Sequence, residues 1–189
     1  MQQVSAVLVV AGPACSGKST LAKAMAGELS AAVFSQDEVL TEIIPDSDRN
    51  LKDRLLSYDE MFKRAQQSYE SGNTVILEGT FSRREHRRGL IRAFPDARVT
   101  ILELQVPLKE ALERFSKRKD HPATDLTAKI VEERNGDYPY SPAVSLIDGS
   151  SPIDQQLTRA LSIVKSGIFH DADAWKNLGV RTANLGRDL

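Results

Sequence analysis

The stretch AVLVVAGPACSGKSTLAKAM, residues 6–25, decides the fold of this chain. It opens with a short run of apolar, mostly β-branched residues, which is typical of a buried strand. The run ends at Gly12, and helical spacing begins near Lys18. Leu21 and Met25 then fall on one face of the expected helix. Between strand and helix stands a complete match to the pattern G-x-x-x-x-G-K-S, which predicts a glycine-rich loop that joins them.

A loop of this kind is built to hold phosphate groups. Its glycines let backbone N–H groups turn inward around an anion, and the following helix presents its positive end. We expect Lys18 to reach the β- and γ-phosphates of a nucleoside triphosphate as a catalytic group, and the Ser19 hydroxyl to bind Mg²⁺. The residues predicted to bind the nucleotide in this region are Gly12, Pro13, Ala14, Cys15, Ser16, Gly17, Lys18, Ser19 and Thr20. The motif leaves the second substrate open.

Further apolar stretches alternate with amphipathic ones along the chain. Strands are predicted at residues 6–10, 31–35, 74–77, 99–106 and 144–147, and helices at 51–70 and from residues 18, 107 and 152 onward. Strands that alternate with helices favour a parallel sheet with crossover helices, which is an α/β fold. The stretch 167–189 has no clear pattern, and its Trp175 is interpreted as a packing residue.

Length and composition exclude several classes of protein. A chain of 189 residues predicts a single domain over 1–189, and a formal net charge of −1 excludes a globally basic nucleic-acid-binding surface. The single cysteine, Cys15, cannot form an intrachain disulfide, so a reducing compartment is expected. The apolar run Ala6–Ala11 is too short to span a membrane or to act as a signal peptide. We therefore expect a cytoplasmic protein without a membrane partner.

Other nucleotide-binding classes fit the sequence less well. The patterns D-x-x-G and N-K-x-D, which mark switch-type GTPases, do not occur. Motor ATPases usually end a strand with two acidic residues, whereas the third predicted strand ends with Glu78 alone. Both observations favour a small phosphotransferase.

Two carboxylates follow predicted strands, where the carboxyl ends of a parallel sheet line the site. Asp37 stands just past the second strand, and there it can accept the proton of an attacking hydroxyl or serve as a helix N-cap. Glu78 ends the third strand, and it can hold Mg²⁺ through water or remain a solvated acid.

Two arginines lie four residues apart on the helix after the fourth strand. Arg114 and Arg118 share a helix face, so one can stack on adenine while the other contacts the γ-phosphate. The alternative is a solvated basic face, because Lys117 and Lys119 are also there.

These features resemble the small P-loop kinases. The likeness rests on the glycine-rich loop, Asp37, the VILEGTF segment at Val75–Phe81 and the R-x-x-x-R pair, and it covers about residues 4–165. The chain is most similar to the branch that contains polynucleotide kinases, zeta toxins and chloramphenicol phosphotransferases, often labelled as ATP-binding AAA-type proteins. This resemblance implies a three-layer P-loop NTPase fold, strand order 2-3-1-4-5, ATP and Mg²⁺ as cofactors, and a small helical lid.

The resemblance also implies roles for individual residues. Asp37 matches the base that acts on the acceptor hydroxyl, and the lid matches about residues 114–138, with Arg118 as its phosphate-contacting arginine. Pro152 matches the region beside adenine. Many relatives carry an arginine three residues after the aspartate, and in polynucleotide kinases it helps to hold the substrate phosphate. Here Leu40 stands at that position, which weakens the polynucleotide hypothesis. The usual acid at the end of the third strand is Asp, and Glu78, which stands there, can still reach a metal or water with its longer side chain.

Several arginines follow the third strand and give a local positive field. They are Arg83, Arg84, Arg87, Arg88 and Arg92. Arg83 and Arg87 share one helix face and are the predicted acceptor-binding pair for an anionic acceptor or a nucleic-acid end. The alternative is a solvated helix face, and no aromatic residue is interleaved for base stacking. The three histidines lack the partners of a zinc site.

The function predicted from the sequence is an ATP-dependent kinase that transfers the γ-phosphate to a hydroxyl of a small molecule. One alternative is a polynucleotide 5′-hydroxyl kinase. Another is a nucleotide-binding regulatory module that turns over no metabolite.

Overall fold

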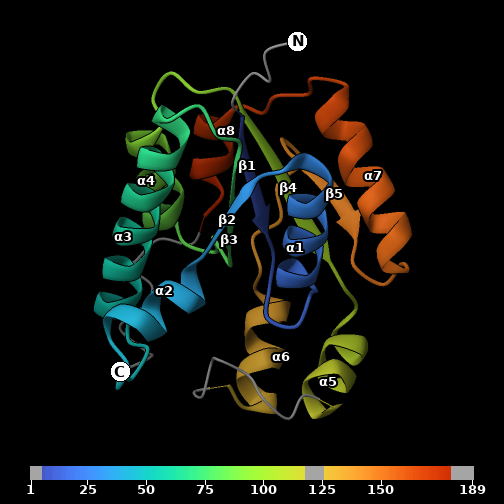
Figure 1. Cartoon of the computed structure of the whole chain (residues 1–189). Coiled ribbons are helices and arrows are strands. Elements are labelled where there is room, and N and C mark those ends of the chain that lie inside the picture. Colours follow the sequence, from blue (N-terminus) through green and yellow to red (C-terminus); the bar gives the residue numbers. More distant parts are fainter. Residues whose placement is uncertain (1–5, 118–125, 180–189) are drawn as a thin grey trace.

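A five-stranded parallel sheet forms the centre of the computed structural model, which describes residues 6–117 and 126–179 (Figure 1). The strands are β1 (Val7–Ala11), β2 (Ala32–Ser35), β3 (Val75–Gly79), β4 (Val99–Gln105) and β5 (Ser145–Asp148). Their order across the sheet is β2-β3-β1-β4-β5. The α/β class and the strand order 2-3-1-4-5 are therefore confirmed.

Helices cover both faces of the sheet and make three layers (Figure 1). One face carries α1 (Lys18–Leu29) and α7 (Ile153–Lys165). The other carries α3 (Leu51–Glu70), α4 (Arg84–Ala93) and α8 (Ala172–Asn177). Past the carboxyl ends of the strands lie α2 (Gln36–Ile43), α5 (Leu108–Lys117) and α6 (Ala128–Gly136).

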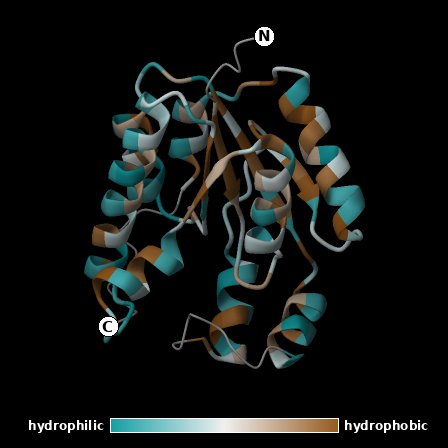
Figure 2. Cartoon of the chain, in the orientation of Figure 1, coloured by the Kyte–Doolittle hydropathy of each residue, from teal (hydrophilic) through white to brown (hydrophobic). Residues whose placement is uncertain are grey.

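Successive side chains of β1 point to opposite faces of the sheet, and both faces are buried, which explains its unbroken apolar sequence. Val7 and Val9 pack into the core beneath α3 and α4, whereas Leu8 and Val10 pack into the core beneath α1 and α7. Figure 2 shows the resulting hydrophobic strands at the centre of the molecule. A strand that is buried on both faces has no solvated side, so its sequence shows no polar alternation.

The glycine-rich loop leaves β1 at a position that only glycine fits. Gly12 has φ 147°, and a Cβ there would lie 2.8 Å from the Leu104 carbonyl oxygen. At the other end of the loop, Gly17 has φ 99° and precedes α1. Ala14 and Cys15 pack with Val106, Ala111 and Val131 against α5 and α6, which fixes the loop at the carboxyl edge of the sheet.

Parts of the predicted lid lie among the described residues. The range 114–138 contains the end of α5 and all of α6, whereas 118–125, including Arg118, lies outside the described residues. The extent of a single domain over 1–189 stays a prediction. In the described ranges, no helix has the length and apolar character that a membrane crossing requires.

Candidate active site

The loop after β1 presents the chemistry of a phosphate site. The Lys18 side chain is buried, and its Nζ donates to the Pro13 carbonyl oxygen at 2.7 Å. Ser16 is fully buried, and its Oγ has no hydrogen-bond partner in the part of the chain that the structure describes. A buried ammonium and an unsatisfied hydroxyl in one backbone cradle fit a bound phosphate. Ser19 and Thr20 are exposed at the start of α1.

Glu78 stands beside this loop. It is buried at the end of β3, and its Oε2 accepts a hydrogen bond from Ser35 Oγ at 2.7 Å. Burial raises the pKa of the Glu78 carboxyl, and the nearby Lys18 ammonium opposes this rise. The expected alternative of a solvated acid therefore does not fit its burial.

The donors near the loop fit Mg²⁺ better than a metal that needs a complete protein cage. Across residues 6–117 and 126–179, no three His, Cys, Asp or Glu side chains gather to hold a metal ion. Ser19 and Glu78 would supply one hydroxyl and one carboxylate. Mg²⁺ commonly takes one or two such protein ligands and completes its shell with water and phosphate oxygens.

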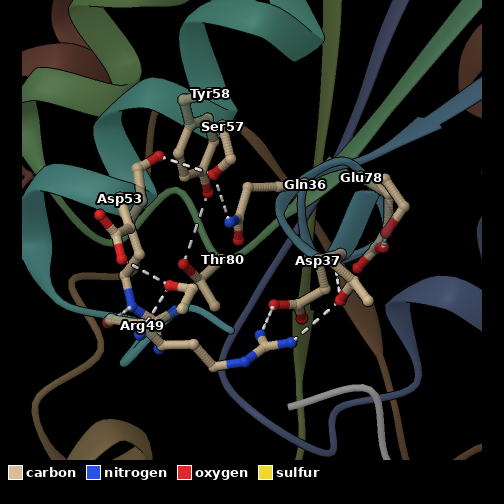
Figure 3. Close-up of polar contacts among 12 residues, drawn as sticks. Gln36, Asp37, Arg49, Asp53, Ser57, Tyr58, Glu78 and Thr80 are labelled. Atoms are coloured by element: carbon tan, nitrogen blue, oxygen red, sulfur yellow. Dashed lines mark hydrogen bonds and ion pairs between the residues drawn. The ribbon is translucent and has the colours of Figure 1, made fainter. Parts of the chain in front are cut away.

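Asp37 lies in the first turn of α2, immediately after β2. The N-cap of that helix is Ser35, so the alternative N-cap role expected for Asp37 is wrong. Its carboxylate Oδ1 accepts a hydrogen bond from Arg49 Nη1 at 2.7 Å, and its side chain is 33% exposed (Figure 3). Asp37 also lies close enough to Glu78 to raise the pKa of that carboxyl. The two carboxylates therefore lie near each other at the carboxyl ends of β2 and β3.

Two buried tyrosines form hydrogen bonds with the turn that follows β3. Tyr58 Oη accepts from the Phe81 N–H at 2.9 Å and lies 3.5 Å from Thr80 Oγ1 (Figure 3). Tyr138 Oη donates to the Thr80 carbonyl oxygen at 2.8 Å. Phe81 has φ 48°, which is unusual for a residue with a side chain, so these bonds hold a strained turn after β3. Burial raises the pKa of Tyr58, and its phenol stays neutral.

Arg114 ties the phosphate loop to the turn after β5. One guanidinium nitrogen, Nη1, donates to the Ser16 carbonyl oxygen at 3.2 Å, and Nη2 donates to the Gly149 carbonyl oxygen at 2.6 Å. Glu110 also pairs with Nη2 at 2.6 Å. Pro152 is exposed at the start of α7, three residues beyond Gly149. Arg114 thus lies beside the phosphate loop and contacts the turn that precedes Pro152, while the contact of both residues with adenine stays a prediction.

The two predicted acceptor arginines occupy different environments. Arg83 is half-buried at the N-cap of α4. Arg87 is fully buried, and its guanidinium pairs with Glu103 at 3.2 Å and lies 4.4 Å from the centre of the Trp175 ring. It also donates to the carbonyl oxygens of Phe81, Trp175 and Pro139. Its helical spacing from Arg83 therefore does not bring both guanidinium groups to one surface.

Sequence reasoning missed two residues of this region. Arg49 stands in the connection between α2 and α3, which carries no motif, so nothing local links it to Asp37. Tyr58 lies within the predicted helix 51–70, and no role in the site was predicted for it. The sequence signal for Tyr58 is its hydroxyl group, which needs a hydrogen-bond partner when the ring is buried on a helix face that packs into the core.

Comparisons with known proteins agree with this geometry. A family model described as "AAA domain" matches residues 7–136. A comparison with curated proteins finds no match.

Solved structures share the fold at low identity. An unliganded sugar kinase from Janibacter sp. is 21% identical with a TM-score of 0.68, covering 93% of this chain and 99% of that one. A gluconokinase from Sinorhizobium meliloti is 17% identical with a TM-score of 0.68, covering 87% and 94%. A Mycobacterium tuberculosis APS kinase is 17% identical with a TM-score of 0.69, covering 85% and 98%. By the family match the chain belongs to the AAA-domain family, and its fold is that of the small P-loop kinases.

Proposed function

We propose that this protein is an ATP-dependent kinase that transfers the γ-phosphoryl group to a hydroxyl of a small molecule. One observation carries the proposal: Lys18 of the phosphate loop and the partly exposed Asp37 carboxylate both act on the Glu78 carboxyl at the carboxyl end of β3. This arrangement supports a reaction in which a phosphoryl donor and a proton acceptor act on the same acceptor hydroxyl.

The proposed reaction balances as a single displacement. The acceptor oxygen forms a bond to the γ-phosphorus of ATP, and the bond from that phosphorus to the bridging oxygen of ADP breaks. The hydroxyl proton passes to an Asp37 carboxylate oxygen and then to solvent. A transition state of this kind gains most from preorganised positive charge, which Lys18 and the loop N–H groups supply. Ser19 and Glu78 would hold Mg²⁺, which when bound neutralises phosphate charge.

The acceptor is proposed to be a small molecule because the arginines after β3 do not form a continuous basic surface. Arg87 is buried within the protein. Leu40, at the position where polynucleotide kinases carry a phosphate-holding arginine, is also fully buried. The structural neighbours named as sugar kinase, gluconokinase and APS kinase point the same way.

The test is ADP formation over a panel of hydroxyl acceptors that includes a 5′-hydroxyl oligonucleotide. Asp37→Asn should keep ATP affinity and lose about 10²- to 10⁴-fold in acceptor-dependent turnover, the usual contribution of a proton acceptor. Lys18→Ala should lose turnover almost completely. Asp59→Asn is the matched control, because Asp59 is an exposed carboxylate on α3, with a side chain 67% exposed.

Other outcomes would overturn parts of the proposal. Wild-type rates in Asp37→Asn would remove its role as base. Labelling of the oligonucleotide alone would make the acceptor a polynucleotide. Slow ATP hydrolysis that no acceptor stimulates would favour the regulatory module.

A further inference from the structure

The connection between α2 and α3 holds one residue in a costly conformation. Arg49 has φ 53°, in the left-handed region that residues with a side chain rarely adopt. Its N–H donates to Ser47 Oγ at 2.8 Å, and its carbonyl oxygen accepts from Arg54 Nε at 2.7 Å. Ser47 in turn donates to Asp53 Oδ2 at 2.6 Å, at the start of α3. The backbone is therefore clamped from both sides in the orientation that sends Arg49 toward the site.

The side chain of Arg49 is buried against the candidate base. It is 5% exposed, and its Nη1 lies 2.7 Å from Asp37 Oδ1, while Nη2 donates to Thr41 Oγ1 at 3.3 Å (Figure 3). Burying a guanidinium is costly unless it is paired and hydrogen-bonded. Because Asp37 keeps a third of its side chain exposed, the pair is reached from solvent at the Asp37 end.

Charges around this pair differ from one side to the other. On the loop side stand Asp37, Glu38 and Glu78, whose mutual repulsion adds to the burial that raises the pKa of Glu78. On the α3–α4 side, burial lowers the pKa of His86 to about 3, and Arg83 and Arg54 act in the same direction. Lys18, in the phosphate loop, opposes the rise in the pKa of Glu78, and the phosphates of ATP would bind there. Away from the loop, Arg49 is a cation in direct contact with Asp37.

From this geometry we propose that Arg49 selects an anionic acceptor. Its guanidinium holds a carboxylate or phosphate group of the acceptor, and the acceptor hydroxyl then lies where Asp37 accepts its proton. Arginine suits this role because its planar fork binds both kinds of anion through paired hydrogen bonds. The acceptor is then a small hydroxylated anion. This inference rests on the proposed kinase function, which defines where the hydroxyl lies.

The test compares acceptors that differ only in charge. The pairs are D-gluconate with D-glucitol, D-glycerate with glycerol, and glycerol 3-phosphate with glycerol, so that carboxylate and phosphate are separated. A charged hydrogen bond is typically worth about 1.5–3 kcal/mol, or about 10- to 150-fold. Arg49→Met should raise KM for the preferred charged acceptor by that factor and change KM for its neutral partner less than about 3-fold. Arg49→Lys should recover part of the loss.

A matched arginine controls for net charge. Arg92→Met removes an arginine whose side chain is 70% exposed on α4, and it should change neither KM nor kcat. Equal losses for charged and neutral acceptors in Arg49→Met would overturn the inference, as would a wild-type preference for the neutral member of every pair.

Binding separates this inference from the proposed function. Wild-type protein with a non-hydrolysable ATP analogue is titrated calorimetrically with each charged probe, and Asp37→Asn and Arg49→Met are titrated alongside. Binding that survives Asp37→Asn and fails in Arg49→Met supports the role of Arg49 even if no phosphate is transferred, in which case the kinase proposal alone falls. The inference is contradicted if wild-type protein binds the charged probes no better than their neutral partners and Arg49→Met binds the charged probes as tightly as wild type does.

Discussion

His86 is a buried histidine that the proposed chemistry does not use. Its ring stacks on Tyr58 with centroids 3.9 Å apart, and neither nitrogen has a hydrogen-bond partner within the described ranges. Burial lowers its pKa from 6.5 to about 3, and Arg83, Arg54 and Arg87 contribute in the same direction. The folded protein therefore keeps this ring neutral where the unfolded chain would protonate it.

This difference predicts a loss of stability in acid. As the pH falls below 6.5, the unfolded state gains a proton that the folded state excludes. The free energy of unfolding should then fall by about 1.4 kcal/mol per pH unit because of this one group. His86→Phe keeps a flat ring against Tyr58 and removes the titration, so its stability should fall less steeply between pH 6.5 and pH 5.

Urea unfolding of both proteins at several pH values measures the effect. Burial also lowers the pKa of His170, but that contribution is common to the two proteins and cancels in their difference. Parallel stability curves for wild type and His86→Phe would contradict the prediction.

The positions of candidate site residues were predictable from the sequence where they depend on local geometry. The loop residues stand in a contiguous motif, and the position of Asp37 follows from its place after a strand. Arg49 was not predictable, because its partner is 12 residues away across a connection without a motif. The environment of Arg87 depends on Glu103 and Trp175, which are distant in the sequence. Helical spacing alone grouped Arg87 with Arg83 and could not show that Arg87 is buried.

Between elements, the packing of α3 against α4 depends on a glycine. A Cβ at Gly89 would lie 2.5 Å from Phe62 Cε2. Phe62 is itself buried, with Tyr58 and Phe81 rings 5.8 Å and 6.2 Å away, so its ring has little space to move. In α1, by contrast, a Cβ at Gly27 would meet nothing within 4 Å.

The two helical glycines should respond to alanine in opposite directions. Gly27→Ala should stabilise the protein by about 0.5–1 kcal/mol, because alanine is the better helix former. Gly89→Ala should destabilise it by about 1–3 kcal/mol, because overpacking outweighs the same propensity gain. Thermal unfolding of the pair checks this, and a stabilised Gly89→Ala would show that α3 and α4 separate easily.

Elements were predictable where an amphipathic pattern runs long enough. The pattern over 51–70 gives the bounds of α3, and the weak stretch 144–147 corresponds to β5. Helix α2 was not separated, because it begins at the residue after β2 with no linker between them. Helix α8 is six residues long and is held by its tertiary contacts, so no periodicity reveals it.

At the scale of the whole molecule, alternation of strands and helices predicted a parallel sheet, whereas the strand order came from the family resemblance. Crossover rules leave several orders open, and the choice among them depends on contacts between distant segments. One such contact joins β4, α4 and α8. Glu103 Oε1 accepts from Trp175 Nε1 at 2.6 Å and from Arg87 Nη2 at 3.2 Å, and Oε2 accepts from the Ser141 N–H at 2.9 Å.

Removing one charge from this buried group should destabilise the entire fold. Glu103→Gln leaves the Arg87 guanidinium without its counter-charge in a site where both side chains are fully buried, which typically costs about 3–5 kcal/mol. Glu60→Gln is the matched control, because Glu60 pairs with Arg64 at the surface of α3, where such pairs contribute about 0–1 kcal/mol. Trp175 is the only tryptophan and is fully buried, so its fluorescence follows urea unfolding of both variants. If Glu103→Gln unfolds within about 1 kcal/mol of wild type, the Arg87–Glu103 pair does not stabilise the joint between β4, α4 and α8.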